Sequence, residues 1–276
     1  MNTATPAAHA VAASSPQAAA HAEPLLRVRD LRLRFGGLAA LDGVSFEILR
    51  GETLGIIGPN GAGKTTLFNC LSGLYRPDSG EIALEGRPLR GLPTHRIAAL
   101  GIGRTFQHLA LFPSMTVRDT VLLGGHGRGS AGFLASALAL PSVRREERAL
   151  AARADALLDA LGLAPVAASN VMRLPLLLRK RVEIARALAG EPRLLLLDEP
   201  ASGLTHEEGE ALGTLLLSLR ERFGLTLAVV EHRVSLMMRI CDRILALDFG
   251  RKIAEGTPRQ VREHAEVVRA YLGGPA

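Results

Sequence analysis

Aromatic residues and cysteines are scarce in this sequence. Only 4% of the 276 residues are aromatic and there is no Trp, so Leu, Val, Ile and Ala must fill the core. The two cysteines, Cys70 and Cys241, are too few for a disulfide framework and have no metal-ligand spacing. This cysteine usage is typical of a reducing compartment and indicates a cytosolic protein.

Long hydrophobic runs are also missing. No segment reaches the roughly 18 consecutive apolar residues of a membrane span, so we expect membrane association only through other subunits. Residues 1–24 are rich in Ala, with no basic start and no compact apolar run. We therefore expect a disordered tail rather than a secretory signal.

The net charge of +6 admits a nucleic-acid or anionic-lipid partner, or simply an arginine-rich surface. No short segment concentrates Lys and Arg with interleaved aromatics, as a single-strand binder does. We therefore favour the solvated surface and expect no nucleic-acid partner.

From Leu25 to residue 273 the pattern predicts one α/β domain. Residues 25–35 alternate apolar and polar side chains, and "VSFEILRGETLGIIG" predicts two strands joined by a turn. The apolar runs "RLLLLDEP" and "LTLAVVEH" are typical of parallel strands buried on both faces. Residues 108–190 are mostly helical in pattern, and "RILALDFGRKIAEG" predicts a closing hairpin.

The stretch "GPNGAGKTT" has the spacing of a phosphate-binding loop, G-x-x-x-x-G-K-[ST], and lies between a predicted strand and a predicted helix. Its glycines let backbone N–H groups point at phosphate oxygens. We expect Lys64 to reach the β- and γ-phosphates of ATP and Thr65 to bind Mg²⁺. The predicted nucleotide-binding residues are Gly58, Pro59, Asn60, Gly61, Ala62, Gly63, Lys64, Thr65 and Thr66.

Two acidic residues follow the apolar run "LLLL". Asp198 at the strand end is placed to hold Mg²⁺ through water, and Glu199 is the candidate general base for the attacking water. His232 follows another apolar run, so it should emerge at the same sheet edge as a γ-phosphate sensor. A solvated pair of strand-end acids and a structural histidine are the alternatives.

Two further residues are candidates from their position in the chain. Gln107 lies where the core gives way to the helical insert, so it could couple Mg²⁺ and water to movement of that insert. Phe35 precedes the phosphate loop and is a candidate to stack on adenine, with a core aromatic as the alternative.

Together these segments resemble the ATP-binding subunit of an ABC transporter. The resemblance covers residues 25–273, and it matches Gln107 to the Q-loop, "SGLTHEE" to the D-loop and His232 to the switch histidine. It implies a P-loop NTPase with a RecA-like core, an antiparallel β-subdomain and a helical subdomain at about 108–190. The implied cofactors are ATP and Mg²⁺.

A narrower resemblance is to the branched-chain amino acid importer subfamily, and to the one of its paired ATPases that has an "RTFQ" Q-loop. It depends on "RFGGLAALDGVSF", "GIGRTFQHLALFPSMTV", "LPSVRREE" and "VVRAYLGG". The implied partners are two permeases, a second ATPase (or a second copy) in a head-to-tail dimer, and indirectly a periplasmic binding protein. The implied location is peripheral, on the cytoplasmic side of the inner membrane.

The signature segment departs from the family pattern. "KRVEIARAL" is intact, but the preceding residues lack the expected glycine, and they are Leu174, Pro175, Leu176, Leu177, Leu178 and Arg179. In the family this segment closes over the partner's ATP, and a Cβ at Leu177 hinders that approach and disfavours left-handed backbone. We therefore expect a weakened site over the partner's ATP, unless Arg179, Lys180 and Arg181 compensate by facing a phosphate. The alternative is that these three bases form a solvated face.

Two smaller departures are Thr205 in the D-loop and Arg233 after the switch histidine, where the family has Asn or Asp and then Asp. Three alternatives to the amino acid importer stay open. They are an importer of urea or short amides, a nucleotide-binding regulatory or structural subunit with little turnover, and an ABC ATPase of DNA repair or translation. The last class has long coiled-coil inserts or two fused cassettes, and this sequence has neither.

Overall fold

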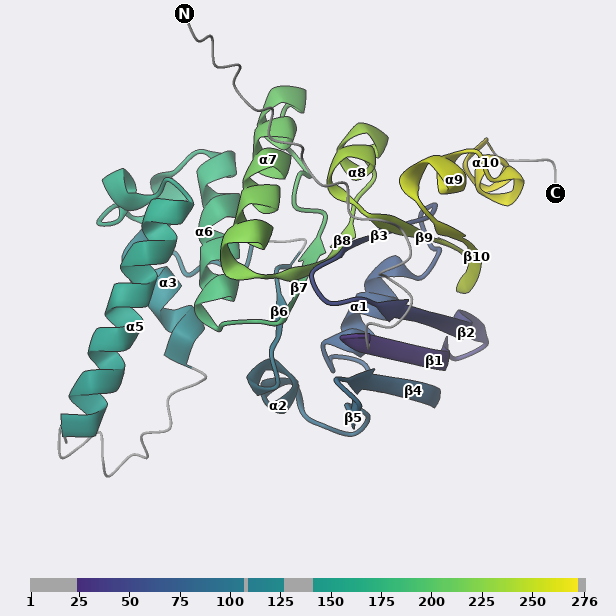
Figure 1. The fold of residues 1–276 in the computed structure, drawn as a ribbon, viewed down its shortest axis with the longest axis horizontal. Coiled ribbons are helices and arrows are strands. Elements are labelled where there is room, and N and C mark those ends of the chain that lie inside the picture. Colours follow the sequence, from purple (N-terminus) through teal and green to yellow (C-terminus); the bar gives the residue numbers. More distant parts are fainter. Residues whose placement is uncertain (1–23, 107–108, 127–140, 273–276) are drawn as a thin grey trace, which may run out of the picture.

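The computed structural model describes residues 24–106, 109–126 and 141–272, and Figure 1 shows a small sheet and a large sheet with helices around them. The small sheet is antiparallel, in the order β2-β1-β4-β5. Its strands are β1 (Leu26–Phe35), β2 (Leu38–Ile48), β4 (Ser79–Leu84) and β5 (Arg87–Pro88). The alternating residues 25–35 form β1 as predicted, because one face of this sheet is buried and the other exposed.

The large sheet has the order β10-β9-β3-β8-β7-β6 and is parallel except for the β9–β10 hairpin. It consists of β3 (Thr53–Ile57), β6 (Ile102–Arg104), β7 (Leu194–Asp198), β8 (Thr226–Val230), β9 (Arg243–Asp248) and β10 (Arg251–Gly256). The two apolar runs are the neighbouring central strands β7 and β8, and every residue of both is buried. The carboxyl ends of the parallel strands therefore meet at one edge of the sheet.

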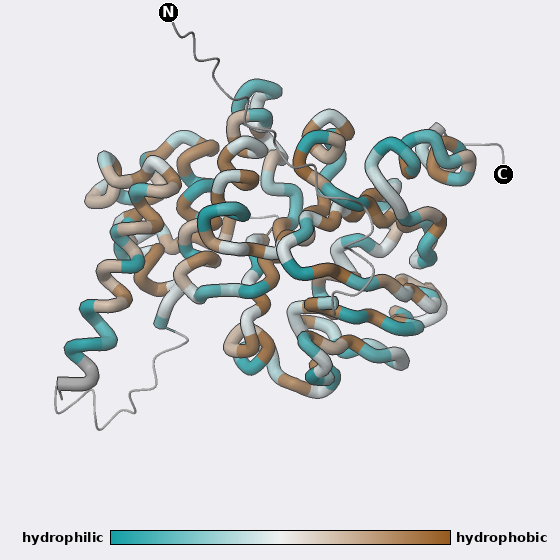
Figure 2. The backbone as a smooth tube through the Cα atoms, in the orientation of Figure 1, coloured by the Kyte–Doolittle hydropathy of each residue, from teal (hydrophilic) through white to brown (hydrophobic). Residues whose placement is uncertain are grey.

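Each face of the large sheet packs against a different layer. In β7, Leu194 and Leu196 belong to the core shared with the antiparallel sheet and α1 (Lys64–Leu71), whereas Leu195 and Leu197 belong to the core shared with the long helices. This alternation follows from the two-residue period of a strand. Figure 2 shows hydrophobic residues concentrated along these strands and the inward faces of the helices.

The helices of the second core come from the middle and the end of the chain. They include α3 (Val117–Gly125), α5 (Pro141–Ala160), α6 (Leu176–Ala189), α7 (His206–Phe223), α8 (Val234–Ile240), α9 (Pro258–Arg262) and α10 (Ala265–Leu272). The remaining helices are α2 (Thr94–Ala99) and the single turns η3 (Ala164–Val166) and η4 (Val171–Arg173). The predicted α/β fold is confirmed, and α3, α5 and α6 account for the helical pattern of residues 108–190.

None of the helices within the described ranges combines the length and the apolar character that crossing a membrane requires.

Candidate functional site

The predicted phosphate loop connects β3 to α1 and depends on glycine at both ends. At Gly58 an added Cβ would overlap the carbonyl oxygen of Leu247 in β9. Gly63 is the N-cap of α1 with φ +98°, and an added Cβ would lie 2.5 Å from the carbonyl oxygen of Ala40. Neither position accepts a side chain without moving backbone, so the loop conformation explains the glycine spacing.

Lys64 closes the loop onto itself. Its ammonium group donates to the carbonyl oxygens of Gly58, at 2.7 Å, and of Pro59, at 2.9 Å. Burial lowers the pKa of Lys64, and the charges of Glu199 and Asp198 act in the opposite direction. The two acidic residues are therefore near enough for their charges to act on Lys64.

The other predicted loop residues differ in exposure. Ala62 is buried, and its carbonyl oxygen accepts a hydrogen bond from Gly250 N–H. Thr65 is exposed in the first turn of α1, so its hydroxyl is accessible to a ligand. Pro59 and Thr66 are half-buried, and Asn60 and Gly61 are exposed.

Asp198 ends β7 in a buried ion pair with Arg104. The guanidinium of Arg104 donates to Asp198 Oδ2 at 2.9 Å, and to Asn69 and Ser72 in and just after α1 at 2.7 and 2.8 Å. The two paired side chains are only 7% and 1% exposed. Burial raises the pKa of Asp198, and the hydrogen bond from Arg104 opposes that rise.

The other oxygen of Asp198, Oδ1, is buried and has no hydrogen-bond partner among the described residues. A buried carboxylate oxygen in this state is rare unless a water or an ion satisfies it. Oxygen donors of this kind are the ligands that Mg²⁺ prefers. The donor set of Asp198 and the exposed Thr65 hydroxyl therefore fits a magnesium ion.

Glu199 and His232 meet at the edge of the sheet, as predicted. The two residues follow β7 and β8, and His232 Nε2 lies 2.8 Å from Glu199 Oε1. Glu199 has φ +49°, an uncommon backbone conformation for a non-glycine residue and one that is enriched at functional sites. The histidine side chain is 43% exposed, so the pair is open to a ligand.

A third carboxylate, Glu231, supports this pair and was not predicted. It is 3% exposed, and it accepts hydrogen bonds from the backbone N–H groups of Ala201 and His232, at 2.6 and 3.1 Å. It thereby joins the segment after β7 to the segment after β8. Its signal in the sequence is a charged residue directly after a fully apolar strand.

Gln107 lies outside the described residues, but the segment before it is anchored at two points. Thr105 N–H donates to the carbonyl oxygen of Leu196, and Phe106 N–H donates to Glu183 Oε1 at 2.9 Å. Glu183 is a buried residue of α6, and burial raises its pKa. The segment that leads to Gln107 is therefore attached both to β7 and to the helix of the predicted signature.

Phe35 ends β1, and its ring is 48% exposed. It makes an edge-to-face contact with Tyr75, with ring centroids 5.4 Å apart. The alternative of a buried core aromatic is therefore excluded, and adenine stacking stays a prediction.

The predicted signature residues form the start of α6. Leu174 is buried, Pro175 is the N-cap, and the helix begins at Leu176, so Leu177 has ordinary right-handed backbone. The side chains of residues 176–178 are half-buried against the helical core. Leu177 therefore does not adopt the left-handed backbone that we expect leucine to disfavour, because the helix begins one residue earlier.

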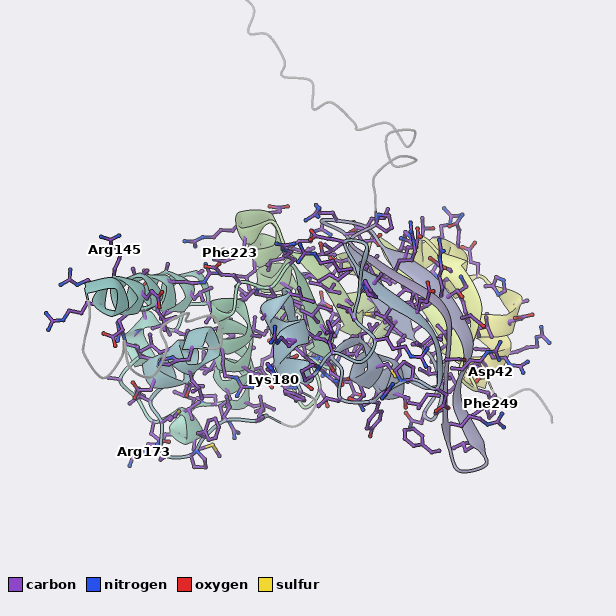
Figure 3. All side chains as sticks on the ribbon, turned by 90° about the horizontal axis from the view of Figure 1, so that it is seen from below. Asp42, Arg145, Arg173, Lys180, Phe223 and Phe249 are labelled. Carbon is purple, nitrogen blue, oxygen red and sulfur yellow. The ribbon has the colours of Figure 1, made fainter. Side chains whose placement is uncertain are left out.

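Lys180 was expected either to face solvent or to face a phosphate, and it does neither in this chain. It is 5% exposed, and its ammonium group donates to the carbonyl oxygen of Glu199 at 3.1 Å. Figure 3 labels Lys180 in the middle of the molecule, with Arg145 and Arg173 at the periphery. The guanidinium of the next base, Arg181, donates to the carbonyl oxygen of Leu161.

The two small departures at Thr205 and Arg233 are neighbours in space. Thr205 is the N-cap of α7, where it forms a capping box with Glu208. Arg233 donates to the carbonyl oxygens of Thr205, at 2.8 Å, and of Leu204. The residue after the switch histidine therefore holds the predicted D-loop of the same chain.

Comparison with known families agrees with this geometry. The family model described as "ABC transporter" matches residues 41–202, and a model described as "Branched-chain amino acid ATP-binding cassette transporter" matches residues 251–276. The chain is 43% identical over 251 residues to the high-affinity branched-chain amino acid transport ATP-binding protein LivG of Escherichia coli, a match covering 91% of this chain and 98% of that protein. The similar protein BraF of Pseudomonas aeruginosa is 41% identical over 250 residues, with the same coverage.

Solved structures give the same result. A nucleotide-free ATP-binding cassette from an ABC transporter has a TM-score of 0.79 and 30% identity, over 91% of this chain and 100% of that one. An ATP-binding cassette in its ADP conformation has the same values. Since one family model spans more than half of the chain and relatives above 40% identity span nearly all of their own length, the chain belongs to the ATP-hydrolysing subunits of ABC transporters, in the branched-chain amino acid subfamily.

Proposed function

We propose that this protein is the ATP-hydrolysing subunit of an importer for branched-chain or related hydrophobic amino acids. The observation on which the catalytic part depends is the pairing of Glu199 with His232, next to the loop that contains Lys64. The substrate class rests on similarity to LivG and BraF, whose names state branched-chain amino acid transport.

In this proposal the loop from Gly58 to Thr66 binds the phosphates of ATP. Lys64 exchanges its bonds to Gly58 and Pro59 for bonds to the β- and γ-phosphates, because anionic phosphates are stronger acceptors than carbonyl oxygens. The start of α1 adds the positive end of a helix dipole. The adenine stacks on the exposed ring of Phe35.

Mg²⁺ fits the donors available beside this loop. Thr65, Asp198 and Gln107 are the residues that we propose to hold it, with Asp198 Oδ1 as the buried oxygen that lacks another partner. Bound Mg²⁺ supplies positive charge that neutralises the β- and γ-phosphates. Arg104 keeps the Asp198 carboxylate oriented through its bond to Oδ2.

Hydrolysis is assigned to Glu199 and His232. Glu199 orients and deprotonates the attacking water as general base. His232 binds the γ-phosphate and, through its contact with Glu199 Oε1, fixes the position of that carboxylate. Glu231 keeps His232 beside the segment that follows Glu199.

We propose further that the chain works in a head-to-tail dimer with a second ATPase, or with its own copy, bound to two permeases on the cytoplasmic side of the inner membrane. A periplasmic binding protein is an indirect partner. The division into a tail at 1–24 and an ABC domain at 25–273, with a helical subdomain at about 108–190, belongs to the same proposal.

The two composite sites of this dimer are proposed to be unequal. The site on this chain's own phosphate loop keeps Lys64, Glu199 and His232. The site over the partner's ATP is closed by the start of α6, where Pro175 has no hydroxyl and Leu177 replaces a glycine. That second site binds nucleotide but hydrolyses it slowly.

The test is steady-state ATP turnover of the assembled complex with Glu199→Gln in this chain, compared with the equivalent change in the partner. Unequal sites predict that Glu199→Gln removes most of the turnover and that the partner's change removes little. If only the partner's change abolishes turnover, the assignment of the active site to this chain is refuted.

The altered signature also favours a second candidate function, a regulatory nucleotide-binding subunit with little turnover. The same assay separates the two, because a regulatory subunit tolerates Glu199→Gln without loss of rate. An importer of urea or short amides is separated by asking which solute, with its binding protein, stimulates the ATPase of the reconstituted complex.

A further inference from the structure

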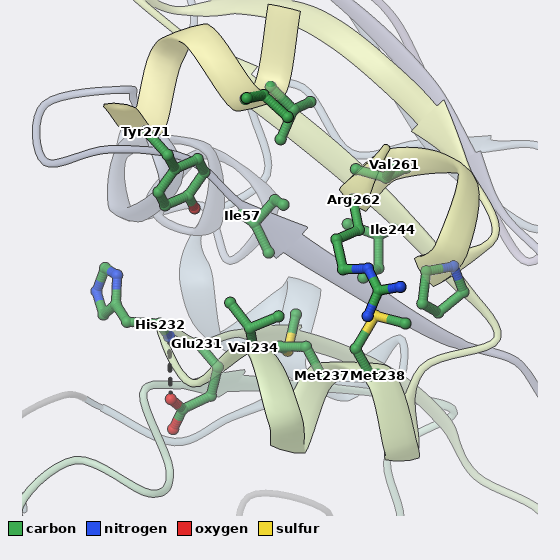
Figure 4. A pocket seen from close by; sticks show the side chains of 13 residues that line it. Ile57, Glu231, His232, Val234, Met237, Met238, Ile244, Val261, Arg262 and Tyr271 are labelled. Carbon is green, nitrogen blue, oxygen red and sulfur yellow. Dashed lines mark hydrogen bonds between the residues drawn. The ribbon is translucent and has the colours of Figure 1, made fainter. Parts of the chain in front are cut away.

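The C-terminal part of the chain, which the branched-chain subfamily model matches, contacts the phosphate loop directly. Tyr271, in α10, accepts a hydrogen bond from the backbone N–H of Gly58, and the two atoms are 2.8 Å apart. The residues are 213 positions apart in the sequence. Figure 4 shows Tyr271 and Ile57, the last residue of β3, as lining residues of one pocket.

This contact holds the N–H side of Gly58, and the carbonyl side of the same residue faces Lys64. The N–H of Gly58 donates to Tyr271, and the carbonyl oxygen of Gly58 accepts from Lys64 Nζ at 2.7 Å. Gly58 is buried, so its N–H needs a partner inside the protein. Tyr271 and Lys64 are therefore linked through a single residue, Gly58.

The same C-terminal segment faces the loop that contains the switch histidine. A mostly apolar cavity of about 320 Å³ separates α10 and α9 from α8, and both Glu231 and His232 line it. Because this cavity lies beside α10, the helix makes fewer apolar contacts with the rest of the chain than a closely packed one. The hydroxyl of Tyr271 is thus a specific polar attachment of α10 to the nucleotide site.

We propose that Tyr271 is a positioning residue for the phosphate loop. By satisfying Gly58 N–H it fixes the backbone at the start of the phosphate loop, and the C-terminal helix thereby sets the affinity of this site for ATP. In this role Tyr271 touches neither the nucleotide nor the attacking water, so it acts on ATP binding and not on the chemical step. The proposal rests on the assignment of the loop as the ATP site.

The test variant is Tyr271→Phe, which keeps the ring and removes the hydroxyl. Val268→Ala is the matched control, because Val268 lies on the same helix and lines the same pocket, and its side chain has no group that could accept the Gly58 N–H. The measurements are the Kd of the full-length protein for a fluorescent ATP analogue, and KM and kcat for ATP in the assembled complex.

We expect Tyr271→Phe to raise both Kd and KM roughly tenfold, because a buried N–H loses its partner, while kcat changes less than twofold. Val268→Ala should lower Tm and leave Kd and KM within about twofold of the unchanged protein. Unchanged Kd and KM in Tyr271→Phe, or an equal rise in Val268→Ala, would overturn the proposal.

Amide hydrogen exchange gives a readout that does not depend on ATP. In Tyr271→Phe the Gly58 amide should exchange faster, while Gly55 inside β3 keeps its protection. If both amides lose protection together, the effect is general unfolding and the positioning role fails. If the unchanged protein binds no ATP analogue but Gly58 exchange responds as expected, the assignment of the ATP site fails and the contact stands.

Discussion

The phosphate loop and the start of α6 are both proposed to bind ATP phosphates, but they differ in what constrains their sequences. In the loop, Gly58 and Gly63 have backbone atoms of the same chain where a side chain would go. At the start of α6, residues 176–178 are three consecutive leucines that pack half-buried on the helical core. Leucine is therefore compatible with this chain's own fold at α6 and incompatible with it in the loop.

This difference teaches where each half of a composite site is specified. The phosphate loop, with Asp198, Glu199 and His232, is held by contacts inside one chain, so its sequence follows from the fold. In the proposed dimer, the residues at the start of α6 are restrained by what faces them across the interface. A departure there, such as Leu177, is compatible with the fold of this chain, and in the proposed dimer it acts only on the partner's nucleotide.

The largest effect is expected from Glu199→Gln. In the assembled complex it should lower turnover by about 10²- to 10⁴-fold, because a general base is lost, while ATP binding is retained. The control is Glu221→Gln on the exposed face of α7, which should leave turnover unchanged. If turnover survives Glu199→Gln, the composite site on this chain's phosphate loop is not the more active of the two.

Arg104→Met tests whether the contacts inside this chain stabilise the phosphate-loop side of the site. It leaves the buried carboxylate of Asp198 without its cation, and we expect the free energy of unfolding to fall by about 3–5 kcal/mol. The control is Arg259→Met, which removes the exposed partner of Glu263. It should lower the free energy of unfolding by less than about 1 kcal/mol. Denaturant unfolding of both variants decides whether the Arg104 pair is exceptional.

Gly58→Ala and Gly37→Ala compare a crowded glycine with an open one. The methyl group at Gly58 meets the carbonyl oxygen of Leu247, and we expect a loss of about 1–3 kcal/mol in stability together with weaker ATP binding. At Gly37 the methyl group meets no described atom within 4 Å, so Tm and ATP affinity should hardly change. Equal losses would contradict the claim that close backbone approach specifies the loop.

Leu177→Gly should have the smallest effect. It should lower the stability of the chain and raise the rate of ATP hydrolysis at the second site. Glycine in the first turn of α6 should cost about 1 kcal/mol in the stability of the isolated chain. In a complex whose active site on this chain is blocked by Glu199→Gln, the same change should raise residual turnover about tenfold. Removing one hydrogen-bond donor to the transferring group typically lowers the rate by ~10²- to 10³-fold. We expect a smaller gain here, because the backbone N–H groups of α6 are already present.

If Leu177→Gly lowers stability without raising residual turnover, the altered signature is not what limits the second site. Leu215→Gly in α7, also half-buried in the helical core, controls for the stability loss alone.

The fold and the centre of the site were predictable because their signals are local. Strand alternation, the glycine loop and the apolar runs each specify backbone geometry from neighbouring residues, and β1, β3, α1, β7 and β8 formed where expected. His232 could be assigned to the edge near Glu199 because parallel strands end together, and the 2.8 Å contact confirms that position.

The supporting residues were not predictable because their partners are distant in sequence. Arg104 lies 94 positions from Asp198, and Phe106 lies 77 positions from Glu183. Lys180 looked like one of three surface bases, yet it is buried against the backbone of Glu199. Charged residues of this kind have no sequence pattern that tells a buried pair from a solvated one.

The sequence by itself determined the class of protein, the phosphate loop and the residues at the ends of β7 and β8, because short-range backbone geometry and strand burial require those residue types. Only the tertiary structure decided which buried charges pair, where α6 begins and that Tyr271 holds Gly58. The physical reason is that a buried donor or charge must find its partner within the packed interior, and packing selects that partner from any part of the chain.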